Sequence, residues 1–216
     1  HFLAIPISGL KGDNIAKTSD VTPWYGGPSL MEHLETVEID EARLRKAPFR
    51  MPVQWVNRPN SDFRGFAGLI ASGRVAPGDA VIVEPSGRTS TIARIVTADG
   101  DLPHAVEGQS VTLVLADEID ASRGSVIVTA DAPMRVTDSL DARLFWAAET
   151  ELLPGATLLA KIGTVTVNAV VTTIRTRIDP ETGNPEPAAR LTANDIADVT
   201  LTLDRAVAVD AYTANR

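Results

Sequence analysis

The middle of the chain alternates short apolar runs, rich in β-branched residues, with turn signals. The predicted strands in this part are residues 80–84, 91–96, 111–115 and 125–129. Pro85-Ser86-Gly87 and Asp99-Gly100 end the first two of them, and an Asp-Gly pair is a strong tight-turn signal. Strands that recur every 8–12 residues or so, without a long helical pattern between them, are typical of a sandwich or a closed barrel. We therefore expect residues 49–134 to form a small β-barrel.

The last third of the chain, residues 135–216, continues the β pattern. Residues 141–147 alternate, and one face of this strand is predicted to carry Ala142, Leu144 and Trp146. The other strands predicted here are residues 158–162, 165–173 and 199–203. Residues 179–187 contain three prolines and are predicted to form an exposed loop. This part should therefore be a second β-barrel.

The first 48 residues follow a different pattern. The apolar residues 2–7 predict a buried strand, and a polar loop follows them. Ser29 and Glu32 have the spacing of a capping box, and apolar side chains then recur at helical intervals, so a helix is predicted over residues 29–39. The charged residues 41–48 end in proline and are predicted to be a linker.

The composition excludes cysteine-based sites and argues against two kinds of partner, nucleic acid and membrane. With no cysteine, the chain of 216 residues has no disulfide framework, no thiolate metal site and no cysteine nucleophile. A net charge of −8 counts against nucleic acid as a partner, because Lys and Arg must neutralise the phosphates. No apolar run approaches the roughly 18 residues that cross a bilayer. We expect no membrane contact and a cytoplasmic location.

Three common nucleotide-binding and catalytic motifs are absent from the sequence. It contains no G-x-x-x-x-G-K-[ST], no G-x-G-x-x-G and no G-x-S-x-G. The histidines at 1, 33 and 104 are too scattered for a metal site. Residues 62–65 match the D-x-x-G of a nucleotide switch, but without an upstream phosphate loop we interpret them as a turn that opens a strand. No catalytic residue and no metal ligand is predicted in this chain.

Four segments resemble parts of translation-factor-type GTPases. Residues 68–79 (GLIASGRVAPGD), followed by 108–111 (GQSV) and 123–127 (RGSVI), resemble the first β-barrel after the GTPase domain of elongation-factor-like proteins. Residues 5–14 (IPISGLKGDN) resemble the last guanine-contacting element of such GTPases. The resemblance implies an incomplete guanine contact through Ser8, Gly9 and Leu10. Gly9 stands where Ala is usual, and a small residue there allows close approach.

Two further segments are more specific. Residues 22–32 (TPWYGGPSLME) and 53–65 (VQWVNRPNSDFRG) resemble the GTPase subunits of bacterial sulfate adenylyltransferase. Such subunits also occur fused to adenylylsulfate kinase. This resemblance extends over essentially the whole chain. It implies a mostly β fold, with two consecutive translation-factor-like β-barrels, 49–134 and 135–216, preceded by the last strand and helix of an α/β GTPase domain in residues 1–48.

The resemblance also implies an activity for the parent protein. The parent would bind GTP and Mg, and its GTP hydrolysis would drive a small catalytic subunit that joins sulfate to ATP, giving adenylylsulfate and pyrophosphate. The phosphate loop, the switches and the N-K-x-D element would lie upstream of this chain. We therefore expect the chain alone to be no enzyme and to bind no cofactor.

The expected role of this chain is contact with partners. Arg58, Asn60, Asp62 and Arg64 follow a predicted buried strand and form either a surface for the catalytic subunit or a solvated loop. In the family the second barrel continues beyond this point, so its last edge should be open here, and another chain, including a second copy, should cover it. Two alternatives remain: a translation-factor-like RNA-binding module, and a structural spacer.

Overall fold

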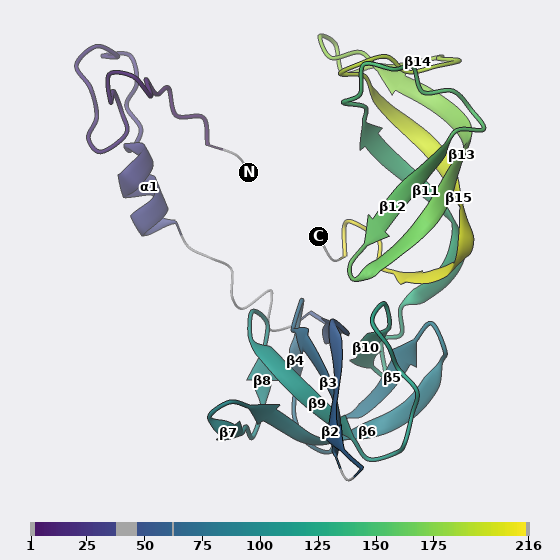
Figure 1. Ribbon diagram of the computed structural model, residues 1–216. Helices are drawn as coiled ribbons and strands as arrows, with labels where there is room; N and C mark the ends of the chain where they lie inside the picture. Colours follow the sequence, from purple (N-terminus) through teal and green to yellow (C-terminus); the bar gives the residue numbers. More distant parts are fainter. Residues whose placement is uncertain (1–2, 38–46, 62, 215–216) are drawn as a thin grey trace. The chain divides into compact units, whose positions relative to one another are not determined.

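The computed structural model describes residues 3–37, 47–61 and 63–214 (Figure 1). The chain divides into two compact units, His1–Glu41 and Ala42–Arg216. The first contains the helix α1, and the second contains the β-strands. Most of the regular structure is therefore β, as the sequence predicts.

The helix α1 spans Leu30–Thr36 and begins as predicted. The hydroxyl of its N-cap, Ser29, accepts a hydrogen bond from the Glu32 N–H at 3.3 Å, as in half of a capping box. The helix ends earlier than residue 39, because Val37 is already extended. Thr36 and Val37 are β-branched and form helices poorly. Residues 38–39 lie outside the described part.

The strand predicted over residues 2–7 is wrong where the structure describes it. Residues 3–8 belong to no strand, and the side chains of Leu3 and Ile7 are exposed. An extended segment needs a neighbouring strand for its backbone groups, and none of the described residues pairs with this one. Among residues 3–37 the buried side chains are polar, namely Asn14 and Ser29. This unit is therefore organised by hydrogen bonds.

The first sheet of the second unit is formed by residues 50–129 and has the order β1-β10-β5-β6-β9-β3-β2, with β7 beside β6. Its strands are β1 Arg50–Pro52, β2 Trp55–Asn60, β3 Phe63–Leu69, β5 Ala80–Glu84, β6 Arg88–Thr97, β7 Gly100–Asp101, β9 Ser110–Leu115 and β10 Val126–Thr129. A small separate sheet pairs β4 Arg74–Val75 with β8 Ala105–Val106. The four strands predicted in this region correspond to β5, β6, β9 and β10.

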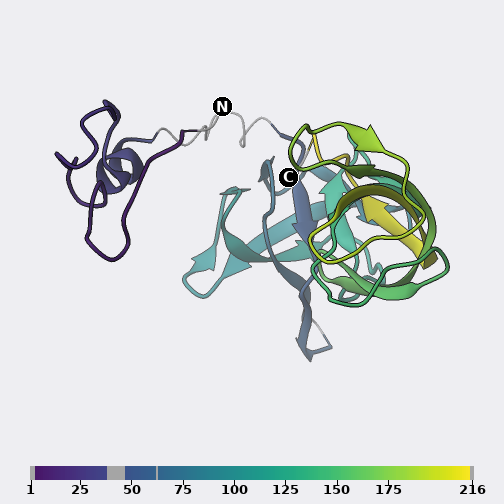
Figure 2. The same ribbon diagram turned by 90° about the horizontal axis from the view of Figure 1, so that it is seen from above.

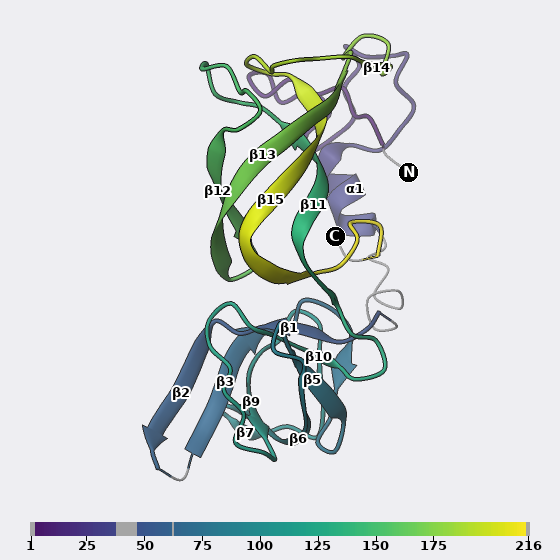
Figure 3. The same cartoon turned by 90° about the vertical axis from the view of Figure 1, so that its right-hand side faces the viewer.

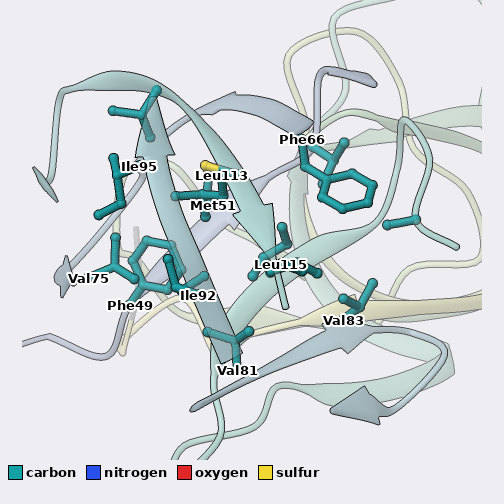
Figure 4. Close-up of a cluster of buried hydrophobic side chains, with 14 of the residues drawn as sticks. Phe49, Met51, Phe66, Val75, Val81, Val83, Ile92, Ile95, Leu113 and Leu115 are labelled. Carbon is teal, nitrogen blue, oxygen red and sulfur yellow. The ribbon is translucent and has the colours of Figure 1, made fainter. Parts of the chain in front are cut away.

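The first sheet curls back on itself. Arg50 in β1 donates its N–H to the Ser72 carbonyl at 3.0 Å and accepts from the Ala71 N–H at 2.8 Å, just after β3. Apolar side chains fill the interior, among them Met51, Phe66, Ile92, Ile95 and Leu113 (Figure 4). Alternation along β9 and β5 places every second residue in this core.

The second sheet has the order β11-β15-β13-β12, with β14 beside β13 (Figure 3). Its strands are β11 Arg135–Phe145, β12 Thr157–Ile162, β13 Val165–Ile178, β14 Pro185–Glu186 and β15 Ile196–Val209. Register shifts interrupt β11, β13 and β15. Such bulges bend strands, and Figure 2 shows the strands of this sheet curling around. Buried apolar side chains, among them Val171, Leu191 and Val199, form a core. Ala142, Leu144 and Trp146 pack on that core together, as predicted.

The second sheet ends at β11 on one side and at β12 on the other. Within the described residues neither of these strands has a further hydrogen-bonded neighbour on its outer side. A groove of about 1160 Å³ lies along β11, with Ile162 and Tyr212 among its lining residues. The sheet therefore presents two strand edges.

Candidate nucleotide-contact loop and partner surface

Ser8, Gly9 and Leu10 lie together in one tight turn. The Ser8 carbonyl accepts from the Gly12 N–H at 2.8 Å, and its hydroxyl accepts from the Lys11 N–H at 3.2 Å. A Cβ added to Gly9 would meet no atom within 4 Å, so the space around it is open. Leu10 is 96% exposed at the tip. The turn offers backbone N–H groups and a hydroxyl oxygen, but no acid–base pair.

Asn14 organises this turn, although no functional role was predicted for it. Its side-chain Nδ2 donates to the Pro6 carbonyl and to the Thr22 hydroxyl, each at 2.8 Å. Its Oδ1 accepts from the Ser19 N–H at 2.7 Å, and its carbonyl accepts from the Leu30 N–H at 2.9 Å. Asn14 thus ties the turn to the start of α1. The sequence feature that could have identified it is its position after Gly12-Asp13 in a turn. Asn tolerates positive φ angles, and φ is 54° here.

The predicted partner residues that the structure describes lie on the hairpin of β2 and β3. Arg58 and Asn60 belong to β2 and Arg64 to β3, whereas Asp62 lies outside the described residues. The prediction of a buried strand before them is wrong, because β2 is the last strand of its sheet and Trp55 is 69% exposed. An edge strand meets the core on one face only, here through Val56.

Arg64 is held by an ion pair and by an aromatic ring. Its Nη2 lies 2.7 Å from Oδ1 of Asp120, and its guanidinium carbon lies 5.6 Å from the centre of the Phe66 ring. The Arg64 bond and charge hold the pKa of Asp120 below its ordinary value, and the charges of Arg88 and Arg58 add to this. Arg88 and Asp120 therefore join the surface. No local pattern could reveal them, since Asp120 is 56 positions from Arg64.

A second charged cluster lies inside the second unit and was also missed. Arg50 is buried, and its guanidinium pairs with the carboxylate of Asp210. Glu84 is buried too, and this burial raises its pKa against the opposing effects of the Gly87 N–H and Arg50. Among the residues that the structure describes, no three His, Cys, Asp or Glu side chains are grouped to hold a metal ion.

Several known proteins are similar to this chain. The family described as GTP-eEF1A C-terminal domain-like matches residues 139–216. The chain is 67% identical to sulfate adenylyltransferase subunit 1 of Methylorubrum populi over 99% of the chain and 45% of that protein. It is 49% identical to the subunit 1 of Teredinibacter turnerae over 100% of the chain and 46% of that protein. The chain thus spans about half the length of these curated relatives.

Further relatives and solved structures extend the likeness. The bifunctional enzyme CysN/CysC of Xylella fastidiosa is 47% identical over 98% of the chain and 34% of that protein. A crystal structure of Sup35 complexed with GDP aligns with a TM-score of 0.73 at 22% identity, covering 97% of the chain and 52% of Sup35. The fold is therefore translation-factor-like. Within the described residues no helix is long and apolar enough to cross a membrane.

Proposed function

Since the chain is homologous over nearly its whole length to part of sulfate adenylyltransferase subunit 1, we propose that its parent protein is the GTP-hydrolysing subunit of that enzyme. The parent would support the reaction of ATP with sulfate to give adenylylsulfate and pyrophosphate, in the cytoplasm. The identity of 67% over 99% of the chain is the observation that carries this proposal.

We propose that the region in hand serves subunit contact and communication between domains. The division into residues 1–48, 49–134 and 135–216 is supported by the two sheets, which occupy 50–129 and 135–209. Contacts join these sheets: the Gly124 N–H donates to the Thr164 hydroxyl at 3.1 Å, and Arg50 pairs with Asp210. A displacement of one sheet would therefore be transmitted to the other through these contacts. The partner surface proposed here is Arg58, Asn60, Asp62 and Arg64.

GTP and Mg are proposed as ligands of the parent. Ser8, Gly9 and Leu10 are the residues of this chain that would touch the guanine, and the open space at Gly9 is compatible with a close approach. The nucleotide would supply the free energy of its hydrolysis. The part played by this chain would be to present the backbone N–H groups of a turn that Asn14 holds in shape. The chain alone is proposed to bind neither ligand.

The activity is tested on the full-length subunit that contains this region, mixed with sulfate adenylyltransferase subunit 2. The expected result is adenylylsulfate formation that rises with GTP and is accompanied by GTP hydrolysis. Adenylylsulfate formation that is the same with and without GTP would contradict the proposal.

Self-association through a strand edge is proposed as well. The edges at β11 and β12 offer backbone groups to another strand, and the exposed face of β12 carries Leu159, which is 76% exposed. Exposed edges of this kind pair readily with other chains. Sedimentation velocity over a range of concentrations is the direct test, and a monomer at all of them would contradict it.

A further inference from the structure

We propose that Arg58, Arg64 and Arg88 form a docking site for an acidic segment of a protein partner, and that Asp120 occupies this site until the segment displaces it. The inference deepens the proposed partner surface and rests on it. It adds two residues, Arg88 and Asp120, and a chemical class of ligand, the side-chain carboxylate. We call Arg58, Arg64 and Arg88 the arginine site.

The fold brings the arginine site together from three strands, β2, β3 and β6. The loop that follows β9 is bonded to two of them. Asp117 in this loop accepts from the Ser90 hydroxyl of β6 at 2.8 Å, and Asp120 accepts from Arg64 of β3 at 2.7 Å. The hairpin of β2 and β3 extends away from the rest of its sheet (Figure 3). Asp120 is thus held by Arg64, and the charges of Arg88 and Arg58 are near enough to act on its carboxylate.

Arg64 is fixed in place before any ligand arrives. Its guanidinium lies over the buried Phe66 ring, and its side chain is only 25% exposed. Its Nε is buried and has no hydrogen-bond partner among the described residues. A planar guanidinium that is already ordered loses little entropy when it binds a carboxylate. Arg64 is therefore the anchor of the site.

Asp120 is suited to be displaced. Its side chain is 88% exposed, and an ion pair with so exposed a partner contributes little to stability. Displacing Asp120 would leave the three guanidinium groups of the arginine site against Asp117 and Glu118 of the same loop, a net charge of +1 in a chain of net charge −8. Such a local excess attracts anionic partners. A carboxylate from another protein would replace Asp120 without leaving an unpaired charge in the core.

The same features favour an acidic protein segment over RNA. RNA binding without base readout depends on exposed aromatic rings that stack on bases and on a continuous basic track. Asp117, Glu118 and Asp120 interrupt the positive charge, so the three arginines form no continuous basic track, although Trp55 on β2 is exposed. A guanidinium fork matches the two oxygens of a carboxylate. A short segment with a few acidic side chains therefore suits the site better than a polyphosphate chain.

The test uses the full chain and a fluorescent hexaglutamate peptide. A labelled hexa-adenylate RNA is titrated in parallel and represents the alternative class of ligand. Binding is followed by anisotropy at low salt. We expect the peptide to bind, Arg88→Gln to weaken it about three- to tenfold, and Asp120→Asn to strengthen it by a similar factor. The matched control is Arg74→Gln, which makes the same charge change on β4. Equal weakening by Arg88→Gln and Arg74→Gln, or tighter binding of the RNA, would overturn the proposal.

A second titration separates this inference from the proposed function. Sulfate adenylyltransferase subunit 2 replaces the peptide, with the same variants. Binding that ignores Arg88→Gln and Asp120→Asn would overturn the arginine site and leave the contact with subunit 2 standing. No binding of subunit 2, together with peptide binding that depends on Arg88 and Asp120, would refute that contact and support the site for another acidic partner. Circular dichroism confirms that each variant is folded.

Discussion

The guanidinium of Arg50 lies against the carboxylate of Asp210, with Nε 2.9 Å from Oδ2 and Nη2 3.2 Å from Oδ1. Arg50 belongs to β1 of the first sheet, whereas Asp210 directly follows β15 of the second. Arg50 also donates from Nη1 to the Phe49 carbonyl at 3.0 Å. A two-pronged ion pair with a buried arginine fixes geometry, because neither charge can turn away without losing its partner.

Removing the carboxylate should therefore be costly. We expect Asp210→Asn to lower the free energy of unfolding by about 2–4 kcal/mol, because it leaves the buried Arg50 charge without its main partner. Urea unfolding measures this loss. The control is Asp204→Asn, since Asp204 makes an exposed hydrogen bond to Asn168. Equal losses of unfolding free energy in the two variants would contradict the prediction that the buried ion pair stabilises the fold more than the exposed hydrogen bond does.

Glu84 predicts a dependence of stability on pH. Burial raises its pKa above the ordinary 4.5, so between 4.5 and the raised value the folded state binds more protons than the unfolded state. Stability from this group is thus present below pH 4.5 and is lost as the pH rises through the folded pKa. The free energy of unfolding of Glu84→Gln should therefore rise relative to that of the wild type as the pH rises to neutrality. Urea unfolding at several pH values checks this, with the exposed Glu118→Gln as control. A difference that shrinks as the pH rises would contradict it.

Asn14 is predicted to hold the turn of Ser8 and Leu10 to α1. Asn14→Ala removes three side-chain hydrogen bonds and leaves a non-glycine residue at positive φ. We expect amide hydrogen exchange at Ser19 and Leu30 to accelerate at least about tenfold, since local opening becomes easier. Asn168→Ala, at an exposed hydrogen bond on β13, should leave these two amides unchanged. Unchanged exchange in Asn14→Ala would refute the role.

Substitution by alanine should affect the stability of this turn differently at its two glycines. Gly9 has open space and no positive φ, so Gly9→Ala should be neutral or stabilise the turn by about 0.4–1 kcal/mol. Gly12 has a φ of +80°, so Gly12→Ala should destabilise it by about 1 kcal/mol. Hydrogen exchange of the Gly9 and Gly12 variants, measured at Ser8, gives the comparison. The same sign in both would contradict the geometry.

The β12 edge yields a prediction about association. Leu159→Lys places a charge on the exposed face of an edge strand and should abolish concentration-dependent dimerisation, because Lys on an edge opposes strand pairing. Leu153→Lys is the matched control, since Leu153 is also exposed but lies before β12. Sedimentation velocity distinguishes the two. Dimers that persist in Leu159→Lys would exclude this edge.

Local patterns predicted most of the strands and little of the charged clusters. The strand 80–84 was predicted with its observed limits, because alternation and the turn after it are both local signals. The strand predicted over residues 2–7 was wrong because apolar residues do not form a strand without a neighbouring strand to pair with. Arg50 and Asp210 meet across 160 positions, so no spacing rule could pair them. The arginine site arises in the same way, from strands that the fold brings together.

The contact with the catalytic subunit is the central claim, and calorimetry tests it most directly. The chain is titrated with sulfate adenylyltransferase subunit 2 at low and at physiological salt. We predict saturable binding that persists at physiological salt and weakens in Arg64→Gln and Arg88→Gln. No heat of binding at either salt concentration would contradict the claim.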